Sequence, residues 1–297
     1  MGSDYCNKMS NSIFSQSVFV VLICFFILIA TSAECASSLE SEVPEIPSIF
    51  TLIANHFSSS SLAIFLSEWE AVVFSVMIAI AISLLFFLTA KRPTMIPTPL
   101  QNFLELIIDY LRKFILDILG PQGEKYVPFL GTLFIYILTM NWIALVPFMK
   151  PPSSSLNVTL ALAICVFCLV QYLNMKNYGF FGFIYHLAGS PKSTLEWILV
   201  PLMFPIELLT QITRPVTLAL RLFGNVLGED ILVGAAALFG VYLLSSFDLA
   251  IGLPVQLPLM FLVLLTGLMQ ALVFTLLSTV YILLSSPDLK GEGKQHS

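Results

Sequence analysis

An arginine lies inside a long apolar segment of this chain, and two adjacent acids follow it. Residues 215–230 read PVTLALRLFGNVLGED, so Arg221 has apolar neighbours on both sides and Glu229 and Asp230 come about two turns later. Arginine keeps its charge at any physiological pH, and placing it at the centre of a membrane helix costs at least about 2.5–3.5 kcal/mol. A cation kept at that cost is typical of a site that acts on ions or on a partner chain.

Helical geometry sorts these polar groups into two zones. At 100° per residue, Asp230 points away from Arg221 and Glu229 points sideways, whereas an ion pair within one helix needs a spacing of three or four. Glu207 falls near the arginine's face. The other members of that face are Arg214, Thr217, Leu218, Gly224, Asn225 and Gly228. We therefore expect a cation that faces a partner and acids that face other helices, where carboxylates at membrane depth load and release ions.

The acids and the glycines also have structural interpretations. Glu229 and Asp230 fit a solvated position at the outer membrane interface, with no role in transport. Small residues beside a buried cation let another helix approach closely, but Gly224 and Gly228 also fit ordinary packing within this chain.

A glutamine stands in the last apolar segment, which contains no charge. Gln270 shares a helical face with Thr266 and Gly267, and a buried amide needs hydrogen-bond partners. Candidate partners are Arg221, Asn225 and the acids across a helix pair. The alternative is a Gln–Thr bond that serves only helix packing.

Composition identifies the class of protein. The chain has 297 residues, of which 58% are hydrophobic and 10% charged, whereas soluble domains carry about a quarter charged residues. Several apolar runs reach bilayer-spanning length, which predicts an all-α integral membrane protein. The 13 Lys and Arg residues form no stripe interleaved with aromatics, so the sequence does not support nucleic-acid binding.

Two cysteines form a C-x-x-C inside one of these apolar runs. Cys165 and Cys168 have no second pair and no histidine nearby. A redox or metal site needs a solvated, electropositive environment, so we expect both to be small buried packing residues.

The hydropathy pattern predicts five spanning helices and one helix on the membrane surface. The spans are expected at residues 71–90, 128–148, 156–175, 195–244 and 259–284. Apolar residues recur at helical spacing over residues 98–120 but are interrupted by charges, which is typical of an amphipathic helix lying on a membrane. Three prolines are expected to bend the fourth span.

The N-terminal region resembles an export signal. An apolar core at residues 18–30 follows Lys8 and ends in small residues. We expect residues 1–33 to be a signal peptide, with an extra membrane helix as the alternative, and residues 34–69 to be an exported acidic tail. All basic residues near the spans except Lys150 then lie on one side, which places the N-terminus outside and residues 286–297 in the cytoplasm.

Several motifs together resemble one family, the a subunit of the membrane sector of F-type ATP synthases. They are RPVTLALRLFGN followed by an acid, GLMQALVFTLLSTVYI, PTPLQNFLELI, the Asn141 span ending in Pro147, and SLNVTLALA. The resemblance covers residues 70–285 and implies a membrane domain whose last two helices form a long, tilted hairpin against a rotating c-subunit ring. It also implies contact with the b-subunit stator stalk, other synthase subunits and the lipid bilayer, with no cofactor, no metal and no ATP site.

The resemblance implies roles for individual residues. Arg221 matches the family's arginine, which faces the ring carboxylates, favours proton release and keeps ions from leaking between two offset half-channels. Asn225 and Gln270 match polar residues that flank it. Asp230 matches an ionisable group of the half-channel open to the outside, and Glu207 matches an acid of the half-channel open to the inside.

One position departs from the family pattern. Many relatives carry His or Glu two turns before the glutamine of the last helix, where this chain has Val263. Glu229, the extra acid beside Asp230, is the candidate that compensates. Which acid relays the ion on the outer side is therefore left open between the two.

We predict a stator subunit that carries protons to and from the c-ring and couples ion flow to ATP synthesis. Na⁺ is the alternative coupling ion. Its oxygen ligands would lie mainly on the rotor, which is not part of this sequence. A stand-alone ion-coupled transporter would show an internal repeat with broken helices, which is not found, and a structural scaffold would leave the polar residues without a purpose. The leader favours a bacterial plasma membrane, with a thylakoid membrane as the alternative, because mitochondrial transit peptides are Arg-rich and the first arginine is Arg92.

Overall fold

The computed structural model describes residues 70–90, 99–146, 149, 151–187, 194–245 and 256–286, in which all regular structure is helical. The long helices are α4 (Glu70–Ala90), α5 (Pro99–Leu119), α6 (Val127–Trp142), α7 (Leu156–Leu187), α8 (Thr194–Ser245) and α9 (Gln256–Ser285). Five helical segments of this part of the chain are long and apolar enough to cross a membrane. The predicted all-α, five-span membrane architecture is confirmed. The predicted signal peptide, exported tail and nearly all of the C-terminal tail lie outside the described residues.

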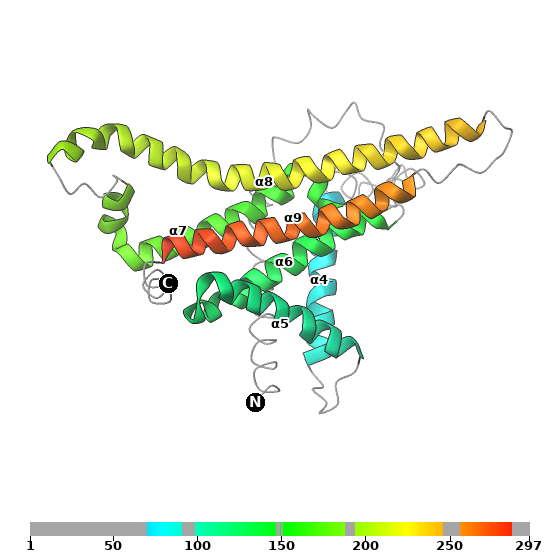
Figure 1. Cartoon of the computed structure of the whole chain (residues 1–297), viewed down its shortest axis with the longest axis horizontal. Helices are drawn as coiled ribbons and strands as arrows, with labels where there is room; N and C mark the ends of the chain where they lie inside the picture. Colours follow the sequence, from blue (N-terminus) through cyan, green and yellow to red (C-terminus); the bar gives the residue numbers. More distant parts are fainter. Residues whose placement is uncertain are drawn as a thin grey trace, which may run out of the picture.

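The helix α8 is the longest of the described helices, and α9 packs along it. They run alongside each other across the view in Figure 1, with α7 seen between them, α6 beneath α9 and α4 running steeply across their direction. Pro201, Pro205 and Pro215 lie inside α8, where each removes one backbone hydrogen bond. The helix nevertheless continues through all three, and it is visibly bowed, as the sequence predicts.

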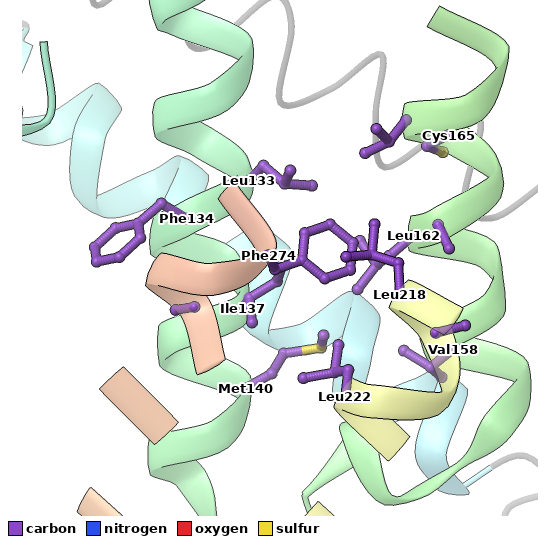
Figure 2. Packing of buried hydrophobic residues seen from close by; sticks show 14 of the residues in the cluster. Leu133, Phe134, Ile137, Met140, Val158, Leu162, Cys165, Leu218, Leu222 and Phe274 are labelled. Carbon is purple, nitrogen blue, oxygen red and sulfur yellow. The ribbon is translucent and has the colours of Figure 1, made fainter. Parts of the chain in front are cut away.

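The main apolar core lies where α6, α7, α8 and α9 meet. Phe274 of α9 is fully buried at its centre, between Leu133 and Ile137 of α6 on one side and Leu162 and Leu218 on the other (Figure 2). A membrane supplies little hydrophobic drive between helices, so such close side-chain packing is what holds a helical membrane protein together. The core therefore fixes α8 and α9 against α6 and α7.

The second span ends earlier than the sequence predicts. Its helix was expected to reach residue 148, but α6 passes into the 3₁₀ turn η2 (Ile143–Leu145) and then stops. Val146 has φ −85° and ψ 120°, which is extended. The physical reason is the following Pro147, whose ring disfavours helical geometry in the residue before it.

The third span is longer than predicted. Helix was expected to end at residue 175, but α7 runs to Leu187 with a break at Gly179, whose φ is 68° and ψ 169°. Only glycine adopts this backbone conformation without strain. The polar residues after the membrane segment thus continue as a redirected helix, where the sequence indicated a cytoplasmic connection.

The amphipathic helix α5 packs on α6 and α9 through one face. Leu111, Ile115 and Leu119 are buried at four-residue spacing, whereas Phe103 and Tyr110 are exposed. This agrees with the predicted amphipathic pattern. The predicted position of α5 on a membrane surface stays a prediction.

Candidate functional site

Arg221 lies on the exposed side of α8, just beyond the packed core. Leu218, Leu222 and Val226 form a buried stripe at four-residue spacing that faces the other helices. Arg221 itself is exposed. The ion pair between Arg112 and Glu124 lies elsewhere, and among the described residues no carboxylate forms an ion pair with Arg221.

The glycines beside Arg221 have no close neighbours outside their own helix among the described residues. A Cβ atom built on Gly224 or Gly228 would find no other atom within 4 Å, apart from the atoms of its own helix backbone and chain neighbours. The interpretation that these glycines serve close packing within this chain is therefore wrong. Their small size leaves the surface beside Arg221 open to a helix of another chain.

An amide pair links α8 to α9 one turn beyond Arg221. The Nδ2 of Asn225 donates a hydrogen bond to Oε1 of Gln270 at 2.9 Å. Gln270 is 5% exposed, and its remaining donor, Nε2, is buried without a partner among the described residues. Of the partners considered from the sequence, Asn225 is thus the one that pairs with Gln270, and the alternative Gln–Thr bond is not formed.

The two adjacent acids lie in different surroundings. Glu229 is half-buried and lies near Thr266 of α9, whose hydroxyl donates to backbone carbonyls of its own helix. Thr266 follows Val263, itself buried, by one turn. Glu229 therefore lies beside another helix, as predicted, one turn from Val263. Asp230 is more exposed than Glu229.

Glu207 lies far from the other site residues along α8. It is half-buried and stands fourteen positions before Arg221, which corresponds to about 21 Å of helix at 1.5 Å per residue. By the same measure Glu207 and Asp230 are about 35 Å apart along the helix. The structure therefore brings Asn225 and Gln270 together but leaves the acids at opposite ends of the segment centred on Arg221.

A small pocket with apolar walls and a few polar groups lies between α7, α8 and α9 on the Glu207 side of Arg221. The Arg214 guanidinium lies over the ring of Tyr281, 5.4 Å from its centroid, and Nε2 of Gln171 donates to Oε1 of Gln211 at 2.9 Å. The cavity volume is about 30 Å³, and one water needs roughly 10–15 Å³. Because Pro215 has no N–H, the Gln211 carbonyl lacks its helical donor. The pocket therefore has the size and the polar groups to hold water.

Comparison with known proteins decides the family. The sequence profile of the family described as "ATP synthase A chain" matches residues 72–283, which is well over half of the chain. The chain belongs to this family. The resemblance inferred from the sequence motifs is confirmed, and the match covers all of the candidate site residues.

Curated relatives agree with this assignment. The ATP synthase subunit a of Protochlamydia amoebophila is 57% identical over 253 residues, which cover 85% of this chain and 93% of that protein. The proteins of the same name from Trichlorobacter lovleyi and Geobacter sulfurreducens are 35% and 33% identical, over 72% of this chain and over 85% and 86% of their own lengths. The chain thus spans most of each relative.

Sequence reasoning missed part of the polar site of this family member. Arg214 was assigned to the arginine's face, but its contact with Tyr281 was not foreseen. Gln171, which pairs with Gln211, was not singled out. Gln171 is an amide inside an apolar run, as Gln270 is. The same criterion could therefore have identified it from the sequence.

The cysteines only partly match the expectation. Both are free, and Cys165 is buried in the main core, in agreement with a packing role. Cys168 is exposed, so the prediction that it is buried is wrong. Three residues turn a helix by about 300°, which moves Cys168 off the buried face of α7.

Proposed function

We propose that this chain is the stator subunit that conducts protons to and from a rotating c-subunit ring and so couples proton flow to ATP synthesis. The observation that carries the proposal is the position of Arg221, an unneutralised cation on an open, glycine-lined side of α8. A cation in a membrane needs a counterion. A carboxylate on a partner helix that approaches Gly224 and Gly228 would supply it.

The distribution of charge along α8 supports two offset half-channels. Glu207 lies on one side of Arg221, with the water-sized pocket between them along the helix, and Glu229 and Asp230 lie on the other. Each proton that crosses 100 mV yields about 2.3 kcal/mol. A fixed cation between the two pathways repels a proton that would pass straight through, so the proton must travel on the carboxylates of the rotor.

The polar neighbours of Arg221 fit supporting roles. The Asn225–Gln270 pair keeps the two helices of the hairpin in contact beside the cation. We assign the outer relay to Glu229, because it contacts Thr266 of α9 near Val263, where relatives have an ionisable side chain. Asp230, which is exposed, would exchange protons with the water of the outer half-channel.

The remaining proposals concern the assembly and the membrane. The open side of α8 would face the c-ring, and the b-subunit stalk and other synthase subunits would hold the chain still. The chain itself would bind no ATP. Residues 1–33 would be removed as a signal peptide, residues 34–69 would lie outside, and the membrane domain at residues 70–285 would end in a cytoplasmic tail in a bacterial inner membrane.

The proposal is tested by ATP synthesis in liposomes that contain the whole complex. An acid–base jump with a potassium diffusion potential drives synthesis, which is measured with luciferase in sodium-free buffer. We expect synthesis with the wild-type chain and none with Arg221→Ala in complexes of equal subunit content. Equal synthesis by both would refute the role of Arg221, and a strict requirement for sodium would refute the proton as the coupling ion.

A further inference from the structure

One buried asparagine joins three elements of the fold. Asn141, in the last turn of α6, is 2% exposed. Its Nδ2 donates to the carbonyl oxygen of Gly267 on α9 at 3.3 Å. Its Oδ1 accepts a hydrogen bond at 2.9 Å from Oγ of Ser153, which is fully buried in the 3₁₀ turn η3 (Pro152–Ser154) between α6 and α7. Both ends of the amide are therefore used.

The next residue of α6 makes a second bond to the same part of α9. Nε1 of Trp142 donates to the carbonyl oxygen of Leu264 at 3.2 Å. Leu264 and Gly267 are three positions apart, so their carbonyls lie on neighbouring turns of one side of α9. Two bonds to successive turns fix both the position of α9 along its axis and its rotation about that axis.

The contact depends on the absence of a side chain at residue 267. A Cβ atom on Gly267 would lie 3.1 Å from Cβ of Asn141 and 3.4 Å from Cδ1 of Trp142. The backbone of α9 thus touches the end of α6 as closely as a glycine allows. A larger residue at position 267 would require Asn141 or Trp142 to move by a few tenths of an ångström or more.

This contact lies next to the amide pair beside Arg221. Gln270 follows Gly267 by three positions, or about 4.5 Å along the helix. A shift of α9 by one residue would move Gln270 by about 1.5 Å and turn it by about 100°. Its bond to Asn225, now 2.9 Å long, would then be lost, because hydrogen bonds weaken steeply beyond about 3.2 Å.

We infer that Asn141 is a positioning residue: together with Ser153 and Trp142 it holds α9 in register, so that Gln270 meets Asn225 beside Arg221. The effect on transport rests on the function proposed above, whereas the effect on geometry does not. Asn141 is buried, and both the nitrogen and the oxygen of its amide are engaged in bonds to other elements, which suits a positioning role.

The geometric test uses a cysteine pair at positions 225 and 270 in an otherwise cysteine-free chain, assembled in the complex in native membranes. A short bifunctional methanethiosulfonate reagent links the pair, and linked chain is quantified by gel shift. The pair is combined with Asn141→Ala or with Asn177→Ala. Asn177 is the matched control, since its Nδ2 donates to the Ser285 carbonyl at the other end of α9 at 3.1 Å.

We expect Asn141→Ala to lower the cross-linking rate roughly fivefold to tenfold, as the loss of a buried hydrogen bond allows, and Asn177→Ala to leave it nearly unchanged. In chains with the native residues at 225 and 270, Asn141→Ala should lower ATP-driven proton pumping by a similar factor, with equal subunit content. Ser153→Ala removes only the bond that orients the Asn141 amide, so it should give a smaller decrease in both cross-linking and pumping. It replaces Asn141→Ala as the test variant if that variant does not assemble.

Three results would overturn the inference. Cross-linking that is unchanged in both Asn141→Ala and Ser153→Ala would show that the register does not depend on this contact. An equal loss in Asn177→Ala would show that any α9 bond matters alike, which is a general packing effect. If cross-linking falls but pumping does not, the positioning of Gln270 is irrelevant to transport, and the inference fails while the family's function is untouched.

Discussion

The spans of α6 and α7 and the span of α8 use apolar residues in opposite ways. In the most apolar 18-residue window of the first two, 44% of the residues are buried within the chain, compared with 11% for α8. The apolar side chains of α6 and α7 pack against this chain itself. Those of α8 mostly point outward, on the helix that also carries Arg221, so this helix is built to meet lipid and a partner.

Two arginines on α8 sharpen the contrast. Arg214 and Arg221 are seven positions apart and share a helical face. Arg214 is half-buried and stacked over Tyr281, whereas Arg221 is exposed and has no ion pair within the described residues. The same side chain therefore supports the hairpin at one position and presents a free charge at the other.

The largest expected effect is a loss of assembled chain when a buried leucine of α8 is replaced, compared with a nearby exposed one. Leu222 is fully buried and Leu220 is 50% exposed. Leu222→Ala should destabilise the chain by about 2–5 kcal/mol because it leaves a cavity, and Leu220→Ala should cost little. The amount of chain retained in membranes, and its melting in detergent, measure the difference. Equal losses would mean that the outward face of α8 is packed in the same way as the inward face.

The next effect is on the open surface beside Arg221. A Cβ at residue 224 meets no atom of the described chain within 4 Å, so Gly224→Leu should leave the chain stable, but the leucine should hold a rotor helix away. ATP-driven pumping should then fall by roughly tenfold or more, since the Coulomb attraction weakens with distance. Gly224→Ala should have an intermediate effect. If Gly224→Leu pumps normally, no partner helix approaches this surface.

Variants of Glu229 and Asp230 distinguish an acid that relays the proton from one that is only exposed. Glu229→Gln should lower pumping roughly tenfold or more, because a positioned proton-transfer group is lost, and Asp230→Asn should lower it less. Pumping rates in vesicles with equal subunit content give the comparison. A larger loss in Asp230→Asn would transfer the relay to Asp230.

The smallest effect is expected at the stacked arginine. Arg214→Gln removes the cation above Tyr281, an interaction worth about 0.5–1 kcal/mol at a partly exposed site. Pumping should fall no more than about fivefold. Tyr281→Leu should give a similar loss, and combining the two should add little. A complete loss in Arg214→Gln would place this arginine in the ion pathway.

Hydropathy and family motifs predict most of the helix positions. The first span was expected at residues 71–90 and the helix is Glu70–Ala90, and the fourth was expected at residues 195–244 and is Thr194–Ser245. Long apolar runs with polar ends leave little freedom in a membrane. The errors came from backbone effects at single residues, Val146 before Pro147 and the left-handed Gly179.

The sequence predicts the residues of the site better than their partners. Helical periodicity assigns Gln270 to a face, but it does not give the rotation and register of the helix opposite. Asn225 was therefore one of several candidate partners until the structure was known. For the same reason the contact of Asn141 with Gly267 and the stacking of Arg214 over Tyr281 could not be derived from spacing.

The most direct measurement is ATP-driven acidification of inverted membrane vesicles that contain Arg221→Ala or Arg214→Ala chains, with subunit content matched to the wild type. Our account predicts that acidification disappears in Arg221→Ala and persists in Arg214→Ala, because only Arg221 presents its charge to the rotor. Normal acidification in Arg221→Ala would contradict the account, since the exposed cation would then be structural and proton flow would be coupled to the rotor elsewhere.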